Sequence, residues 1–276
     1  MKNYILSIIL MLASCYGYAI DLHRPTGAHV AGMGRTSVCN RDLWAVQNNP
    51  AGTAFLKGWQ FGLYYENQWL LKETAFKHAV ITGAFPEFGC IGLTVSQFGD
   101  SGYNESLFGL SYARAFGPYL QMGLQLNGLL FHWGEGYPNQ WGADVALGIQ
   151  SQLTEKLRLG TCLFHPIIRK LGTLQQEPLP VMMRLGLAYQ FTDDFIGQCE
   201  IEHDDSREGF SLRGGMEYVL HERFWLRAGA QHNPDLLSFG VGYRLRQVYM
   251  DVSAQLHQAL GASIQVGICY RVRNEE

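Results

Sequence analysis

The chain has 276 residues, of which 16% are charged, and its formal net charge is −3. A charge this close to neutral, without a basic run, argues against a nucleic-acid partner. Glycine is plentiful, at 32 residues, and aromatic residues make up 13% of the chain, a composition typical of β-barrels. A soluble β-sandwich or propeller is compatible with the same composition, so the order of the residues has to decide.

The first 19 residues predict a signal peptide. Lys2 precedes an apolar run over residues 4–13, and Gly17-Tyr18-Ala19 has the small-x-small pattern of a cleavage site. The run is too short to span a bilayer, and no other stretch reaches 18 apolar residues. An alternative interpretation is a lipobox at residues 12–15, which would leave Cys15 as a lipidated N-terminus. In both cases the chain is exported, and it can enter a membrane only as a closed barrel.

Residues 20–57 do not alternate as strands do. Four glycines between residues 27 and 52 permit positive φ angles, and the run Asn48-Asn49-Pro50-Ala51-Gly52 predicts a turn. We expect a compact, irregular segment with one helical turn around Asp42–Gln47. A segment of this kind ahead of a strand array packs either outside the array or inside it.

Period-two alternation begins at Trp59. In Ala259–Val272, for example, aliphatic side chains alternate with glycine, serine, glutamine, cysteine and arginine. About fourteen such runs follow one another, and most have 9–12 residues, which suits a tilted strand that crosses a bilayer. The expected strands lie near residues 60–66, 75–85, 88–97, 104–116, 120–127, 141–150, 156–164, 181–190, 195–202, 210–218, 224–229, 237–246, 248–257 and 259–272.

The connections between these runs alternate between short and long. Pro86-Glu87 and Gly117-Pro118 are short, whereas Asn67–Thr74 and His165–Pro180 are long. Outer-membrane barrels have tight periplasmic turns and longer outer loops, which places both termini in the periplasm. The polar face has few lysines, unlike the solvent face of a soluble sheet. We therefore predict an all-β fold, a closed antiparallel transmembrane β-barrel over residues 58–272, with a periplasmic tail at 273–276.

The segment before the barrel resembles a known family. The pattern G-A-x-x-A-G-M-G-x-x-x-V followed by N-N-P-A-G is similar to the start of outer-membrane proteins of the FadL (long-chain fatty acid transporter) superfamily, which includes the PorV and PorQ proteins of type IX secretion. The resemblance implies that residues 20–57 form a plug, or hatch, inside the barrel. The matching residues are Gly27, Ala28, Ala31, Gly32, Met33, Gly34, Val38, Asn49, Pro50, Ala51 and Gly52.

Charged residues recur in the inward phase of the predicted strands. Buried charges need partners, so we interpret them as a structural network that holds the barrel and seats the plug. The alternative is a polar conduit or binding site. The network comprises Asp144, Arg184, Glu200, Arg213, Glu217, Arg227, Arg244 and Asp251.

No catalytic, metal or cofactor motif is present in the sequence. The nine histidines include no H-x-x-x-H or H-x-H pair, and His203-Asp204-Asp205 could form at most a weak surface cation site. No arrangement of serine, histidine and carboxylate suits a hydrolase. Cysteines 39, 90, 162, 199 and 269 are widely spaced and are interpreted as isolated apolar residues, with one disulfide left open. We expect no enzyme activity, no cofactor and no metal.

The resemblance implies two functions. The first is passive transport of a hydrophobic small molecule across the outer membrane of a Gram-negative bacterium. The second is a PorV/PorQ-like barrel that conducts nothing and binds type IX secretion proteins. The chain lacks the family's long groove-forming loops, and the candidate groove lies in His165–Pro180, with Ile167, Ile168, Leu171 and Leu174. Membrane lipid is the partner expected in either case.

Overall fold

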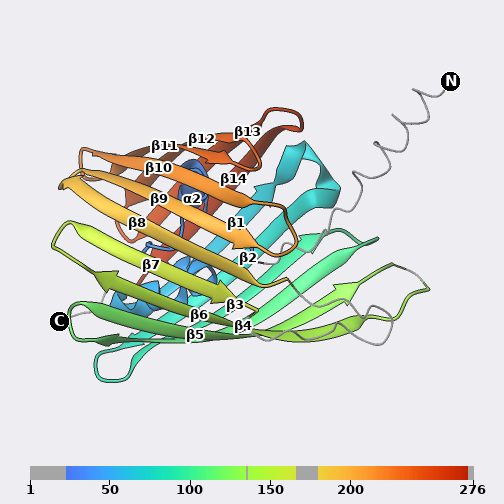
Figure 1. Cartoon of the computed structure of the whole chain (residues 1–276), viewed down its shortest axis with the longest axis horizontal. Helices are drawn as coiled ribbons and strands as arrows, with labels where there is room; N and C mark the ends of the chain where they lie inside the picture. The colour runs from blue at the N-terminus through green and yellow to red at the C-terminus, as the bar shows by residue number, and fades with distance from the viewer. Residues whose placement is uncertain (1–22, 135, 166–179, 273–276) are drawn as a thin grey trace.

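The computed structural model describes residues 23–134, 136–165 and 180–272. Within these residues, fourteen antiparallel strands close into one barrel, because β14 pairs with β1 (Figure 1). The predicted all-β closed antiparallel barrel is confirmed. The strands are β1 (Gly58–Asn67), β2 (Ala75–Phe85), β3 (Gly89–Gly99), β4 (Asn104–Phe116), β5 (Leu120–His132), β6 (Gln140–Gln152), β7 (Leu157–Phe164), β8 (Met182–Thr192), β9 (Phe195–Asp204), β10 (Phe210–Leu220), β11 (Phe224–His232), β12 (Leu236–Leu245), β13 (Val248–His257) and β14 (Gly261–Arg271).

Alternation along each strand sorts the side chains into an outer and an inner set. In β14, Ile264 and Val266 lie on the outside and are 44% and 39% exposed, whereas Gln265 between them faces the lumen and is completely buried. Because side chains on neighbouring residues of a strand point to opposite faces, the same register repeats around the barrel. Many polar side chains and glycines therefore line the lumen, together with buried apolar clusters such as Leu107, Leu129 and Phe131.

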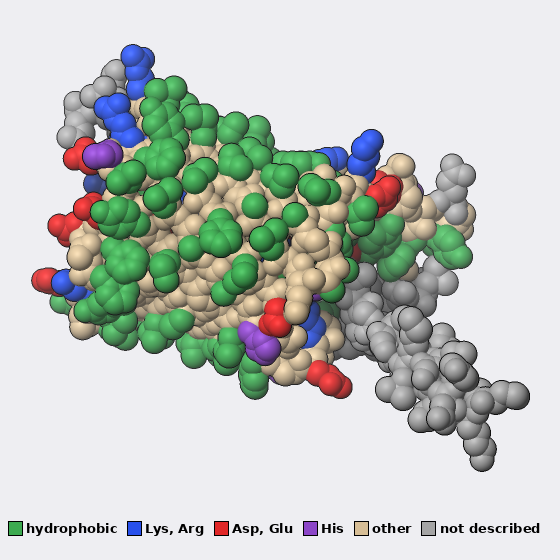
Figure 2. Space-filling view, turned by 90° about the horizontal axis from the view of Figure 1, so that it is seen from above, with side chains coloured by type: hydrophobic (Ala, Val, Ile, Leu, Met, Phe, Trp, Pro, Cys, Tyr) green, Lys and Arg blue, Asp and Glu red, His purple; other side chains and the backbone are tan. Residues whose placement is uncertain are grey.

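The outer surface of the barrel is apolar between two charged ends. Figure 2 shows hydrophobic side chains spread over the strands, with the charged side chains gathered at the two ends. Exposed aromatic residues near one end include Trp59, Tyr189, Tyr243 and Tyr270. An eleven-residue strand such as β2, at ~3.3 Å per residue and a tilt of roughly 40°, spans about 28 Å. That height matches the hydrocarbon core of a bilayer.

The two ends of the barrel differ in their connections. At the turn end, pairs of strands are joined by the short segments 86–88, 117–119, 153–156, 193–194, 221–223 and 246–247. At the loop end lie the other connections between the described strands, including η2 (Gln68–Leu70) and η3 (Lys72–Thr74) after β1, and β7 ends and β8 begins at this end. The chain enters β1 and leaves β14 at the turn end, in agreement with the predicted alternation of short and long connections.

Residues 23–56, which we call the lumen segment, lie inside the barrel (Figure 1). They contain α2 (Ala28–Gly32), α3 (Ala45–Asn48) and the 3₁₀-helix η1 (Pro50–Phe55). α2 packs on β11–β14, and η1 packs on β3–β6. The sequence predicted only one helical turn, around Asp42–Gln47. The additional η1 begins at Pro50, whose fixed φ suits a first helical position, and the Asn49 side chain accepts a hydrogen bond from the backbone N–H of Ala51. Among the described residues, no helix is long and apolar enough to span a membrane.

Candidate functional site in the lumen

The glycines of the lumen segment meet the barrel wall backbone to backbone. Gly34 has a φ of +65°, and a Cβ added to it would lie 2.5 Å from the carbonyl oxygen of Gly214 and 2.6 Å from that of Ala230. A Cβ on Gly32 would lie 3.0 Å from the Cα of Gly240. Neither position has room for a larger residue, so both glycines bring the segment directly against β10–β12.

The Asn48–Gly52 turn anchors the other half of the lumen segment. Asn48 exchanges two hydrogen bonds of 2.8 Å with the backbone N–H and carbonyl of Thr26. Asn49 donates to the carbonyl of Val38 at 2.7 Å and accepts from Ala51 at 3.2 Å. Asn48 is therefore bonded to a residue 22 positions earlier in the lumen segment, and Asn49 to a residue 11 positions earlier.

Glu200 of β9 connects the lumen segment to the charged residues of the wall. Its carboxylate accepts the backbone N–H groups of Ser37 at 2.7 Å and Val38 at 2.8 Å. It also pairs with the guanidinium of Arg213 at 2.8 Å, and Arg213 reaches Glu202 at 2.6 Å. All of these groups are buried, so the charges compensate one another inside the barrel.

The charged residues expected in one lumen network fall into separate groups. Arg184 joins the Glu200 group through Glu202 at 2.5 Å. A second group, nearer the turn end, consists of Arg227 with Glu217 and Asp251, each at 2.6 Å. Arg244 is exposed, and within the described part of the chain it donates to a backbone carbonyl rather than to a carboxylate. Asp144 belongs to neither group and contacts a histidine of the lumen segment.

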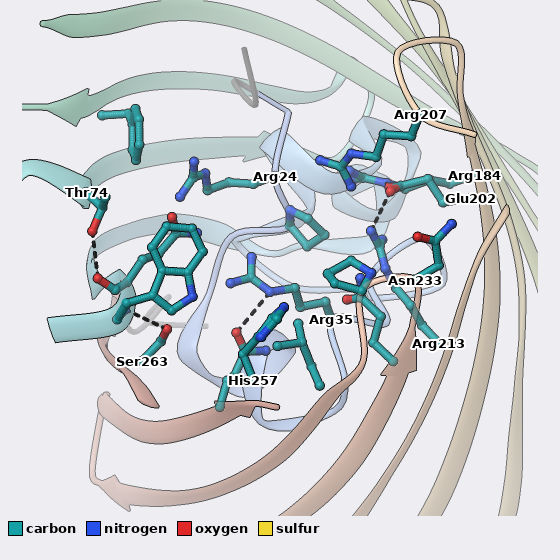
Figure 3. Close-up of a pocket in the computed structure, with 18 residues that line it drawn as sticks. Arg24, Arg35, Thr74, Arg184, Glu202, Arg207, Arg213, Asn233, His257 and Ser263 are labelled. Carbon is teal, nitrogen blue, oxygen red and sulfur yellow. Dashed lines mark hydrogen bonds and ion pairs between the residues drawn. The ribbon is translucent and has the colours of Figure 1, made fainter. Parts of the chain in front are cut away.

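A cavity of about 630 Å³ opens between the lumen segment and the loop end (Figure 3). Its lining includes one carboxylate, Glu202, and an apolar set made up of Pro25, Trp69, Phe98, Pro234 and Leu236. Arg24 lies 4.4 Å above the ring of Phe98, so a basic and an apolar surface meet in the same space. Five arginines line this cavity: Arg24, Arg35, Arg184, Arg207 and Arg213.

Most of these cavity residues were missed by sequence reasoning. Arg184 and Arg213 were expected in the lumen, because both lie in the inward phase of a strand. Arg24 and Arg35 lie in a segment without alternation, so no pattern assigned them a direction. Arg35 reaches Glu66 at 2.5 Å and Gln255 at 3.0 Å, and Gln255 is 220 residues away in the sequence.

A smaller cavity of about 280 Å³ lies at the turn end and contains a histidine–carboxylate pair. His29 Nε2 and Asp42 Oδ2 are 2.9 Å apart, and both side chains belong to the lumen segment. Burial by itself would lower the pKa of His29, but the neighbouring Asp42 carboxylate raises it above its ordinary value of 6.5. Burial likewise opposes ionisation of Asp42, yet the imidazolium lowers the pKa of that carboxyl group. The pair is therefore favoured in its charged form.

The candidate groove residues Ile167, Ile168, Leu171 and Leu174 lie outside the described residues. The cysteines at 39, 90, 162, 199 and 269 are all free, so the disulfide left open by the sequence is not formed among them. Cys199 faces outward, and the other four are buried.

Solved structures with a similar fold include bacterial transporters of low sequence identity. The toluene transporter TodX of Pseudomonas putida aligns with 92% of this chain and 100% of its own, with a TM-score of 0.69 and 14% identity. The toluene transporter TbuX of Ralstonia pickettii covers the same shares, with a TM-score of 0.67 and 13% identity. A Pseudomonas aeruginosa FadL homologue aligns with 89% of this chain and 98% of its own, with a TM-score of 0.65 and 13% identity. No family model and no curated protein matches the chain.

Proposed function

We propose that this protein is an outer-membrane channel that admits a small hydrophobic molecule with an acidic head group. The cavity at the loop end supports the proposal most directly. It has the size of a small-molecule site, at about 630 Å³, and it combines apolar side chains with five arginines. Arginine binds carboxylates well because its planar guanidinium can donate two parallel hydrogen bonds.

The membrane location rests on the outer surface. Leucine and aromatic side chains that are about half exposed would be costly in water, and they form a band of the height that a bilayer requires. In this proposal, residues 1–19 are a signal peptide, residues 20–57 act as a plug, residues 58–272 form the membrane barrel and residues 273–276 are a periplasmic tail. The turn end then faces the periplasm.

Passage through the barrel requires the lumen segment to move. Besides the cavity at the loop end, a second cavity of about 530 Å³ lies at the turn end, lined by residues 54–58 and 84–87 among others. The lumen segment lies between the two cavities and is tied to the wall through Glu200 and the glycine contacts described above. We infer that the molecule stays bound in the loop-end cavity until the lumen segment moves away from the wall.

Whole-cell uptake tests the function. The protein is expressed in a Gram-negative host that lacks its own channels for hydrophobic compounds, and the initial uptake of radiolabelled decanoate, toluene and a small sugar is measured. The proposal predicts faster uptake of decanoate, a smaller gain for toluene and no gain for the sugar. Equal decanoate uptake with and without the protein in the outer membrane would rule out transport.

A matched pair of variants tests the acidic head group. Arg207 lines the cavity and is partly exposed, and its guanidinium lies 3.6 Å from the Asp204 carboxylate. Arg207→Gln is expected to slow decanoate uptake by about two- to fivefold, the effect of one partly exposed charge, and to leave toluene unchanged. Arg223, exposed at the turn end, is the control, and Arg223→Gln should change neither rate. A similar loss for toluene in Arg207→Gln would contradict the role of charge.

The PorV/PorQ-like alternative remains a prediction. The three solved structures compared above are named as toluene transporters and a FadL homologue, not as secretion components. Co-purification of a stable protein partner after gentle extraction, together with no uptake of any probe, would favour the alternative over the channel.

A further inference from the structure

Three buried side chains from distant parts of the sequence meet near the loop-end cavity. They are His23 at the start of the lumen segment, Asp144 of β6 and His165 directly after β7, which are 2%, 8% and 4% exposed. One carboxylate oxygen, Asp144 Oδ2, lies 2.7 Å from His23 Nε2 and 2.9 Å from His165 Nδ1. One ligand atom from each residue can be chosen so that all three lie within 4.8 Å of one another.

Hydrogen bonds alone do not explain this arrangement. The contact from His23 has the geometry of a hydrogen bond, but His165 Nδ1 has no hydrogen-bond partner among the described residues, although the carboxylate oxygen is close. A buried nitrogen without a partner is costly, and each such atom in a native structure calls for an explanation. A cation between the three side chains would accept the lone pair of His165 and satisfy it.

The donor set suits a transition metal. Two imidazoles and one carboxylate are the ligands of many zinc sites, in which Zn–N and Zn–O bonds of ~2.0–2.2 Å set tetrahedral ligand atoms about 3.4 Å apart. The present spacings of 2.7 and 2.9 Å would therefore have to widen by about 0.5–0.7 Å, and all three ligand atoms already lie within 4.8 Å of one another. Three protein ligands leave a fourth position for water.

Neighbouring groups hold the three side chains in place, as the outer shell of a metal site does. Asn127 donates to the other oxygen of Asp144 at 2.6 Å. The second nitrogen of His23, Nδ1, lies 3.5 Å from the side-chain amide of Gln47. The ring of Phe164 packs against His23 with a centroid distance of 4.7 Å and covers the group with an apolar surface.

The positive charge that lies beside the three ligands is already compensated. Arg184 donates to the backbone carbonyl of His23 at 2.5 Å, and its positive charge would repel a cation. The same guanidinium, however, is paired with Glu202 at 2.5 Å, and Glu200 lies 3.9 Å away. Arg184 therefore fixes the backbone of residue 23 without leaving an uncompensated positive charge beside the three ligands.

We propose that His23, Asp144 and His165 bind a divalent transition-metal ion, for which Zn²⁺ is the best match, and that this ion fastens the start of the lumen segment to the barrel wall. The ligands come from the lumen segment, from β6 and from the end of β7, so binding closes a link between parts of the chain that are 121 residues apart. The site can be tested independently of the transport proposal, because none of its three ligands lines the loop-end cavity, although Arg184 lies beside both.

Metal binding by the full-length protein in detergent tests the proposal. The protein is treated with a chelator, freed of it and titrated with Zn²⁺ by calorimetry and with Co²⁺ by visible absorption. One ion per chain is expected, with the strong visible bands of four-coordinate Co²⁺. His23→Asn and His165→Asn should each abolish these signals, and Asn127→Ala should weaken binding by about tenfold. His29→Asn is the matched control, since His29 is also a lumen-segment histidine paired with a carboxylate, and it should bind as the wild type does.

Thermal unfolding of the wild-type protein tests the site even if a histidine variant does not fold. Zn²⁺ should raise the thermal unfolding temperature of the wild-type barrel, and the chelator should reverse the rise. The proposal is overturned if the wild type binds no Zn²⁺ at one equivalent, or if folded His23→Asn and His165→Asn both retain the Co²⁺ bands. It is equally overturned if Zn²⁺ leaves the unfolding temperature unchanged.

Discussion

Replacing Glu200 with glutamine is expected to loosen the lumen segment inside an otherwise intact barrel. The Glu200 carboxylate is buried and accepts the backbone N–H groups of Ser37 and Val38 at 2.7 and 2.8 Å. The same carboxylate balances Arg213 at 2.8 Å. A neutral glutamine has only one acceptor oxygen and adds an N–H₂ group that faces other donors, so it cannot satisfy all three groups.

The magnitude follows from the buried hydrogen bonds that are weakened. Arg213 keeps Glu202 at 2.6 Å, but the backbone N–H groups of Ser37 and Val38 lose a charged acceptor, and hydrogen bonds to charged groups contribute about 1.5–3 kcal/mol each, so we expect a loss of about 3 kcal/mol. Glu217 offers a control, since it pairs with Arg227 at 2.6 Å but is 20% exposed in its side chain. Arg227 also keeps Asp251, so Glu217→Gln should cost only about 1 kcal/mol. The two variants remove the same charge from the lumen at different places.

Cys39 reports on the lumen segment directly. It lies beside the Glu200 contacts, it is 1% exposed, and burial raises the pKa of its thiol to about 12. In a chain whose other cysteines are replaced, a thiol reagent should label Cys39 slowly in the wild type. A loss of ~3 kcal/mol would speed labelling of Glu200→Gln by on the order of 100-fold if labelling follows release of the segment. Equal labelling rates in Glu200→Gln and Glu217→Gln would refute the reasoning.

Three further predictions test other parts of the structure. Gly34→Ala should destabilise the protein by about 2–5 kcal/mol in urea unfolding, because it combines a left-handed φ with overlap on the backbone of β10 and β11; a neutral effect would contradict the close contact. Leu110→Arg, in the middle of the outer surface of β4, should lower the free energy of unfolding in lipid vesicles by about 2–4 kcal/mol. Leu153→Arg, in a turn, should lower it by only about 0–1 kcal/mol. Equal losses would argue against a membrane-facing surface. His29 has a pKa raised by Asp42, so the pair should stabilise fully below pH 6.5 and lose its contribution as the pH rises through the raised pKa. Unfolding midpoints of the wild type and of His29→Asn should therefore converge at high pH, and a constant difference would contradict the pair.

The barrel was predictable because each strand carries its own signal. In β14, Ile264 and Val266 face outward while Gln265 faces the lumen, and this difference can be read from the residues alone. Each short turn also has a local signal, such as Gly117-Pro118 between β4 and β5. For a barrel in a membrane, as proposed above, the closure of fourteen strands then follows, because no strand edge can be left unpaired.

The interior was much less predictable. Helices of four to six residues, such as α3 and η1, are too short to show a periodic pattern. Contacts such as Arg35 with Glu66 depend on how the lumen segment folds back inside the barrel, which no spacing encodes. His23, Asp144 and His165 came together only in the folded chain, so the absence of a short histidine motif gave no indication of them.

Whole-cell uptake of radiolabelled decanoate tests the central claim most directly. Cells with the protein assembled in the outer membrane should take up decanoate faster than cells without it, and Arg207→Gln should reduce the gain while Arg223→Gln preserves it. Identical uptake in cells with and without the assembled protein would contradict the channel function, even if the barrel itself is correctly folded.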